Sequence, residues 1–104
     1  MRISIHSPGD LGLAVRAARR AGNVRLDDLA AVAGVSKQFT SDVEHGKPTV
    51  RLGLVFKLLC ELGVRLELDI PEDAARELAS LRTKHGQPPA SKPASQSSKS
   101  KQRG

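Results

Sequence analysis

Two helix-forming segments meet at a glycine in residues 26–46, which read LDDLAAVAGVSKQFTSDVEHG. Apolar residues of the first segment follow helical spacing, and two aspartates stand in its first turn, where the helix dipole favours acids. We expect Gly34 to end this helix and Ser36 to cap a second one that closes near Gly46. Two short helices joined by such a turn predict a helix-turn-helix arrangement. The apolar residues of the first segment are Leu26, Leu29, Ala30 and Ala33.

The second segment has one face suited to reading DNA. Thr40 and Val43 are three residues apart and are expected to face the core, so Lys37, Gln38 and Ser41 project outward together. In a helix-turn-helix, the first residues of the second helix face base edges in the major groove. Lysine binds guanine acceptors, glutamine binds adenine through two hydrogen bonds, and serine serves either base. These three are the candidate base-contacting residues; the alternative is that the lysine and glutamine are ordinary solvated helix residues.

Two further helices are predicted on either side of this pair. Residues 7–10, Ser-Pro-Gly-Asp, are typical of a helix start, because the serine caps and the proline suits the first helical position. We expect Gly22-Asn23 to end that helix. After the pair, Thr49 is expected to cap a helix that Gly63 ends. The strongest apolar stripe in the chain lies on this last helix and consists of Leu52, Val55, Leu58, Leu59 and Leu62.

Apolar and charged residues alternate over residues 64–70, VRLELDI. A period of two predicts a half-buried strand. One strand cannot satisfy its own backbone groups, so two partners are considered. The preferred one is the same strand of a second copy, paired antiparallel across a two-fold axis; the other is residues 1–5, and both fit in one small sheet. The candidate dimerisation residues are Val64, Leu66, Leu68 and Ile70.

The predicted fold is all-α, a bundle of four to five helices with one C-terminal strand; pairing of that strand with a second copy, the preferred partner, would form a two-stranded lid in a dimer. Residues 1–70 are the DNA-binding and dimerisation domain, and so small a domain is marginal alone, which favours dimerisation. Residues 71–83 are a weak helix or an extended linker. Residues 84–104 hold five basic residues and no acid. Their low apolar content predicts a disordered tail, either solubilising, a basic arm for DNA, or a segment that orders on a partner.

Composition favours an anionic partner and excludes several classes of protein. The 104 residues include 17 Lys and Arg against 11 Asp and Glu, a formal net charge of +6, so nucleic acid is the first candidate. No apolar run is long enough to span a membrane and no signal peptide is visible, so a cytoplasmic location is expected. The single Cys60 excludes an internal disulfide or a cysteine zinc site and is expected to be buried. We expect no cofactor, no metal and no enzyme activity.

The chain resembles the lambda-repressor-like (XRE) helix-turn-helix family, and within it the HipB-type antitoxins. The resemblance rests on SPGDLGLAVRAARR (7–20) and on DDLAAVAGVSKQFTSDVEHGKPTVRLGLVFKLLCELGVRLEL (27–68). The motif A-G-V-S-x-x-x-x-S-x-x-E-x-G-K-P-T, followed by a leucine-rich helix, is specific. It implies a homodimer on a palindromic operator, and it implies that Ser36, Lys37, Gln38 and Ser41 fall on base- and phosphate-contacting positions.

Further backbone contacts are implied by the same resemblance. The loop flanked by Lys47 and Arg51 runs along the DNA backbone in this family. The family usually opens the first helix of the pair with Thr-Gln, where this chain has Arg25-Leu26. The loss of that cap costs about 0.5–2 kcal/mol of stability. Arg25 is still expected to contact a phosphate, because its side chain is positively charged. The arginines at 16, 19 and 20 are expected to form a solvated helix face.

Three functions fit these features. The first is a HipB-like antitoxin that represses its own operon and binds a HipA-like serine/threonine kinase toxin. The second is a stand-alone transcriptional repressor with the same DNA mechanism. The third is a protein-binding adaptor that uses the bundle without DNA. A kinase-like reading frame beside the gene separates the first two, and the dependence of DNA binding on salt separates both from the third.

Overall fold

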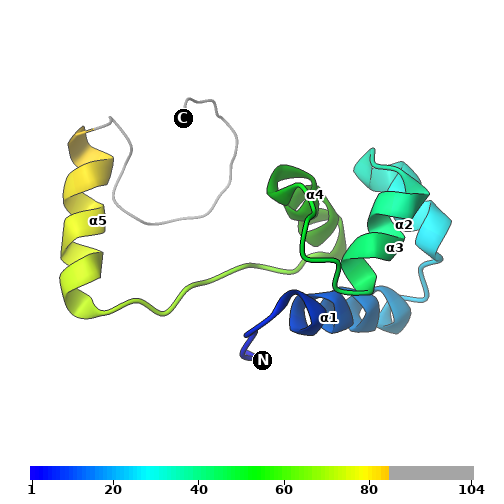
Figure 1. The fold of residues 1–104 in the computed structure, drawn as a ribbon, viewed down its shortest axis with the longest axis horizontal. Coiled ribbons are helices and arrows are strands. Elements are labelled where there is room, and N and C mark those ends of the chain that lie inside the picture. The colour runs from blue at the N-terminus through cyan, green and yellow to red at the C-terminus, as the bar shows by residue number, and fades with distance from the viewer. Residues whose placement is uncertain (85–104) are drawn as a thin grey trace. The chain divides into compact units, whose positions relative to one another are not determined.

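The computed structural model describes residues 1–84, which form five α-helices and no strand (Figure 1). They divide into two units, Met1–Glu67 and the segment from Leu68 onward. The first unit contains four helices and the second contains one. None of the five helices is long and apolar enough to cross a membrane. The helices are α1 (Pro8–Ala21), α2 (Leu26–Ala33), α3 (Lys37–Glu44), α4 (Leu52–Leu62) and α5 (Glu72–Lys84).

The start of α1 follows the sequence prediction. The Ser7 hydroxyl accepts a hydrogen bond from the Asp10 N–H at 3.1 Å, and Pro8 occupies the first helical position. The Asp10 carboxylate accepts in turn from the His6 N–H at 2.9 Å. The first of these bonds satisfies a backbone donor that a helix start leaves free, and the second ties the residue before the cap to the first turn. The predicted stop at Gly22-Asn23 is confirmed, since Asn23 adopts a φ of 57° directly after the helix.

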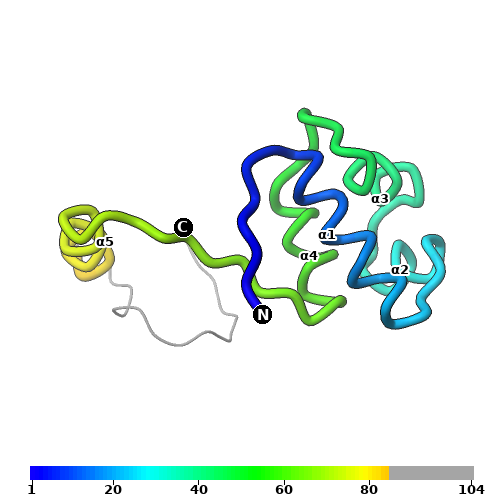
Figure 2. Tube along the Cα trace, turned by 90° about the horizontal axis from the view of Figure 1, so that it is seen from below, coloured from blue at the N-terminus to red at the C-terminus, as the bar shows by residue number. Residues whose placement is uncertain are grey.

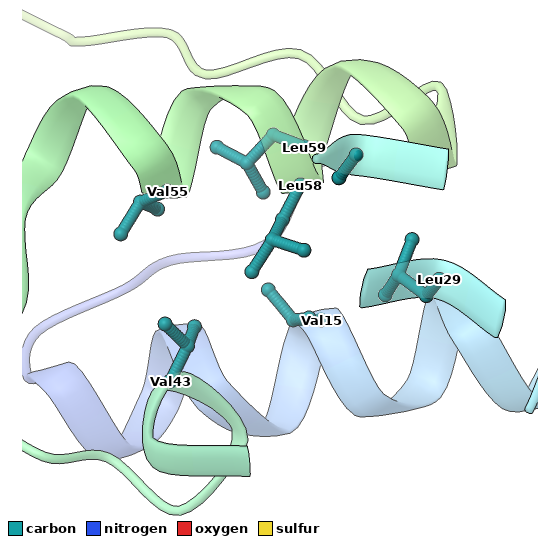
Figure 3. Close-up of a cluster of buried hydrophobic side chains, with 7 residues drawn as sticks. Val15, Leu29, Val43, Val55, Leu58 and Leu59 are labelled. Atoms are coloured by element: carbon teal, nitrogen blue, oxygen red, sulfur yellow. The ribbon is translucent and has the colours of Figure 1, made fainter. Parts of the chain in front are cut away.

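The four helices of the first unit surround one small aliphatic core. Both α1 and α2 contact α3 and α4, as the Cα trace also shows (Figure 2). In Figure 3 the core side chains point toward one another from all four helices. Four side chains, those of Val15, Thr40, Val55 and Leu58, are essentially inaccessible to solvent, so the core is set by a few well-packed groups. The buried cluster consists of Val15, Leu29, Ala33, Val43, Val55, Leu58 and Leu59.

Helix α1 lies very close to the end of α3. A Cβ added at Gly12 would lie 2.4 Å from the Val43 carbonyl oxygen and 2.6 Å from that of Glu44, so only glycine fits there. This approach brings two arginines of α1 to Glu44, whose side chain is 3% exposed. Arg19 donates from Nε at 2.6 Å and from Nη2 at 3.0 Å, and Arg16 donates to the Glu44 carbonyl at 3.3 Å.

The prediction that all three arginines of α1 are solvated is therefore wrong for two of them. Hydrogen bonding to Glu44 raises the pKa of Arg19 above its ordinary value. A buried carboxylate needs such partners, because an unpaired charge in the interior is costly. Arg20 alone of the three is exposed. Sequence spacing did not reveal the pair because its members are 25 residues apart.

Two predictions about α4 are also wrong. The residue that caps the helix is Arg51 rather than Thr49, and no side-chain hydrogen bond is made there. Val50, the residue before Arg51, instead packs against the buried core cluster, and an apolar residue at this position helps to fix the entry of the chain into the helix. Cys60 is exposed rather than buried, because the buried face of α4 is completed by leucines on the neighbouring positions.

Residues 64–70 do not form the predicted strand; they are extended without a backbone ladder. Residues 1–5 are likewise not a strand, although Arg2 Nε lies 3.5 Å from the Glu67 carboxylate. A ladder needs a partner backbone, and within residues 1–84 of one copy no segment supplies it. The lid predicted from the alternating pattern is therefore absent from the single chain.

The second unit consists of a short extended segment and α5. The helix begins after Pro71 and carries Glu72 and Asp73 in its first turn and Arg82 and Lys84 in its last, as the helix dipole favours. None of its residues is buried. The predicted basic tail lies, apart from Lys84, outside the described residues. Its side chains Ala74, Ala75, Leu78 and Leu81 are all exposed.

Candidate nucleic-acid interface

The turn between α2 and α3 is a three-residue corner. Gly34 adopts the left-handed conformation, with φ 76° and ψ 33°, which a residue without Cβ reaches at no steric cost. The N–H of Val35 then donates to the Ala30 carbonyl at 3.0 Å, and its half-buried side chain packs on the core. The corner ends α2 and aims α3 away from it, as the sequence predicted.

Ser36 caps α3 and holds its first turn. Its hydroxyl accepts from the Phe39 N–H at 2.9 Å. Its carbonyl accepts from the Thr40 N–H at 3.1 Å and from the Thr40 hydroxyl at 3.0 Å. The Thr40 side chain is fully buried, so this second bond satisfies a hydroxyl that the core would otherwise leave unpaired. The predicted inward positions, Thr40 and Val43, are both confirmed as buried.

The outer face of α3 presents the three candidate base-contacting side chains. Lys37 and Gln38 are exposed and Ser41 is half-buried. The Gln38 amide nitrogen donates to an Asp42 carboxylate oxygen at 2.8 Å. The Ser41 hydroxyl lies 3.4 Å from Nδ1 of His45. Two of the three side chains thus already have a polar neighbour one helical turn further on, whereas Lys37 extends freely into solvent.

The candidate DNA-backbone cations lie at the ends of helices, and Lys47 contacts a residue of the outer face of α3. Arg25 is the N-terminal flanking residue of α2, makes no capping bond as the sequence predicted, and lies 3.5 Å from the Asp27 carboxylate. Arg51 occupies the same position before α4 and is exposed. Lys47 lies in the loop after α3, with its ammonium 3.6 Å from Asp42. All three are exposed cations of the kind that bind phosphates.

Sequence reasoning missed Asp42, which joins two of the predicted site residues. One carboxylate oxygen accepts from Gln38 and the other pairs with Lys47. The spacing of four between Gln38 and Asp42 on one helix was a usable signal, because such side chains are neighbours. The contact with Lys47 follows from the tight turn after α3, in which the Lys47 N–H donates to the Asp42 carbonyl at 3.0 Å.

The outer face therefore presents hydrogen-bonding side chains, and one of the candidate cations, Lys47, pairs with Asp42 on it. Base edges in the major groove offer donors and acceptors that lysine, glutamine and serine match, and phosphates attract the cations around them. Residues 1–84 contain no group of three His, Cys, Asp or Glu side chains placed to hold a metal ion.

Comparison with known proteins agrees with this geometry. Residues 15–68 match the family model described as helix-turn-helix. An HTH-type transcriptional regulator of Sinorhizobium fredii, y4mF, is 43% identical over 67 residues, which cover 64% of this chain and 88% of that relative.

Solved HipB structures have a similar fold. The chain of a HipB–O4 20mer complex superposes with a TM-score of 0.62 at 24% identity, over 68% of this chain and 100% of that one. A HipA–HipB–O2–O3 complex gives the same values. These matches agree with the described fold and with the exposed outer face of α3. The chain therefore belongs to the lambda-repressor-like (XRE) helix-turn-helix family of DNA-binding transcriptional regulators.

Proposed function

We propose that this protein is a sequence-specific repressor that reads operator DNA with α3. The observation that carries the proposal is the division of that helix into two faces. Thr40 and Val43 are buried, while Lys37 and Gln38 are exposed and Ser41 is half-exposed. With α3 in the major groove, these three side chains contact base edges.

The proposed backbone contacts are Arg25, Ser36, Lys47 and Arg51. Ser36 uses an oxygen lone pair to cap α3, and its O–H remains a donor for a phosphate. The three cations release counterions when they meet phosphates. They supply affinity that does not depend on sequence and fix the register in which α3 reads the bases.

The repressor acts as a homodimer in this proposal. Leu66 and Leu68 are 49% and 82% exposed, and neighbouring exposed apolar side chains of this kind are typical of an interaction site. A shallow hollow of about 350 Å³ adjoins this segment and is lined mainly by apolar atoms of α4 and the residues after it. Pairing with a second copy through Val64, Leu66, Leu68 and Ile70 covers this surface. It also sets two reading helices about 34–36 Å apart on a palindrome.

The oligomeric state tests the dimer separately from DNA binding. Light scattering on a sizing column is expected to give twice the chain mass for the natural protein. Leu66→Asp is expected to give a monomer, because a charge placed in an apolar interface is costly. Leu13→Asp is the matched control, since Leu13 is an exposed leucine of α1 outside the segment. A monomeric natural protein at micromolar concentration would contradict the proposed dimer.

Salt dependence tests DNA binding itself. Binding to fluorescent duplexes selected from a random library should weaken with salt at a slope of about −0.9 per phosphate contact. Specific duplexes should keep an advantage over random ones at every salt concentration. Folded protein that binds no duplex at low salt would favour the adaptor hypothesis instead.

The finer proposal is a HipB-like antitoxin role in the cytoplasm. The fold is shared with HipB, and one of the similar structures is a HipA–HipB–O2–O3 complex. A HipA-like kinase toxin would then be a second partner, and the pair would repress its own operon. Co-purification of this protein with the product of an adjacent kinase-like gene tests the role. If no such gene lies beside the gene of this protein and no kinase co-purifies, the antitoxin role is contradicted and the stand-alone repressor is the function that fits.

A further inference from the structure

One carboxylate on the outer face of α3, that of Asp42, contacts a proposed base-reading side chain and a proposed DNA-backbone cation. Asp42 Oδ1 lies 2.8 Å from the Gln38 amide nitrogen, and Asp42 Oδ2 lies 3.6 Å from the Lys47 ammonium. The Asp42 side chain is 26% exposed and Lys47 is 52% exposed. An acid at this place repels phosphates, so its presence on a DNA-binding face requires a reason.

We propose that Asp42 is a positioning residue that fixes the Gln38 amide in the orientation that reads adenine. The inference rests on the proposed function, in which Gln38 contacts a base. It goes further by assigning the base and by naming the residue that selects it. Asp42 itself touches no base in this proposal.

The chemistry of the contact dictates which end of the amide faces Asp42. An ionised carboxylate only accepts hydrogen bonds, so the NH₂ end of Gln38 must face it. One N–H is then occupied, and the Oε1 acceptor and the second N–H remain for the DNA. A glutamine without this partner is free to turn its amide by 180° and to change its rotamer.

The groups that remain match one base. In the major groove adenine presents an acceptor at N7 and a donor at N6, which pair with one N–H and one oxygen of glutamine. Guanine presents acceptors at both N7 and O6. A fixed Oε1 would lie opposite one of these acceptors, so the Asp42 contact disfavours guanine. Lys47 holds the other carboxylate oxygen and limits how far Asp42 itself can turn.

Two opposite effects follow if the acceptor-only property of Asp42 is removed. Asn at this position donates as well as accepts, so it no longer dictates the orientation of the Gln38 amide. Preference for adenine over guanine should fall by about two- to tenfold, the cost of ordering one side chain on binding. Affinity for random-sequence duplex should rise by about two- to fivefold, because a negative charge is lost and Lys47 is freed.

The experiment compares matched variants on duplexes selected from a random library by the natural protein. Asp42→Asn is nearly isosteric and lies at the surface, so thermal melting is expected to stay unchanged. Asp27→Asn is the control, since Asp27 also pairs with a proposed backbone cation, Arg25, but contacts no glutamine. Asp42→Glu keeps an acceptor-only group one turn from Gln38. Gln38→Ala identifies the base pair that this side chain reads.

The expected result is loss of the adenine preference in Gln38→Ala, its reduction in Asp42→Asn, and its retention in Asp42→Glu. The control Asp27→Asn should raise affinity for random duplex and leave the preference intact. An unchanged preference in Asp42→Asn, or an equal loss in the control, overturns the inference while base reading by Gln38 stands. If Asp42→Asn instead loses a preference for cytosine, Asp42 itself contacts a base and the inference is overturned. If Gln38→Ala changes no preference, the proposed role of Gln38 fails and the inference fails with it.

Discussion

Truncating Glu44 to alanine is expected to destabilise the four-helix unit by about 3–5 kcal/mol, the usual cost of breaking a buried ion pair. The Glu44 carboxylate is 3% exposed and accepts from Arg19 at 2.6 and 3.0 Å. Without it, the Arg19 side chain, which is 13% exposed, has lost the opposite charge that it pairs with. The bond from Arg19 to the Val24 carbonyl at 2.9 Å remains, but it offsets no charge.

The size of this loss matters because the unit is small. Residues 1–67 are expected to unfold with a free energy of about 3–10 kcal/mol. Glu44→Ala should therefore remove a third or more of the total. Urea unfolding followed by circular dichroism in the helix band is the assay. The midpoint should fall strongly while the slope, which reports the surface exposed on unfolding, stays the same.

Two control variants test whether the Arg19–Glu44 pair accounts for the expected loss of stability. Glu61→Ala removes an exposed acid of α4 and should change stability by less than about 0.5 kcal/mol. Arg16→Ala removes a partner whose Nε lies 3.7 Å from the carboxylate and whose side chain is 28% exposed, so it should cost about 1 kcal/mol or less. If Glu44→Ala is as mild as Glu61→Ala, the pair does not anchor α3 and the reasoning is refuted.

The pH dependence of this destabilisation has a definite sign. Hydrogen bonding to Glu44 raises the pKa of Arg19 in the folded state. A base with a raised pKa contributes its full stability below the unfolded-state pKa and loses it as the pH rises through the folded-state pKa. The contribution of Arg19 should therefore be constant around neutral pH and fall only in strong alkali.

Three further predictions concern other parts of the chain. Gln38→Ala should cost about 1–3 kcal/mol on the selected operator and relax preference at one base pair, whereas Lys47→Ala should weaken all duplexes alike and flatten the salt slope; equal behaviour of the two in a binding titration would contradict the assigned roles. Gly12→Ala should lower stability by about 1–3 kcal/mol in urea unfolding, because its Cβ would lie 2.4 Å from a backbone oxygen of α3; an unchanged midpoint would show that α1 shifts without cost. Deletion of residues 85–104 should leave the melting temperature unchanged, and a large drop would contradict the predicted disorder of the tail.

The parts of the fold that sequence predicted are those set by neighbouring residues. Ser7, Ser36, Gly34 and Gly63 act within one turn of their own helix ends, and the structure has each of them where the sequence placed it. The inward turn of Thr40 also follows from helical spacing. Such signals depend only on local backbone geometry, so a single sequence contains them in full.

The parts that sequence did not predict depend on distant residues. The partners of Glu44 come from α1, and the exposure of Cys60 depends on which face of α4 the other helices cover. The strand predicted over residues 64–70 depends on a backbone that one copy does not supply. An alternating pattern reports that one face is apolar, and it does not report which molecule covers that face.

The two carboxylates of α3 are expected to have different roles, Glu44 in the stability of the fold and Asp42 in the choice of base. With eight residues, this helix is too short to be stable alone, so tertiary contacts must hold it. Glu44 does this on the inner face through Arg19, and its loss should weaken binding to all duplexes in proportion to the unfolded fraction. Asp42 lies on the outer face, and its carboxylate contacts Gln38 and Lys47. Its substitution should change the preferred base and leave the urea midpoint unchanged, so the two effects are separable in one set of variants.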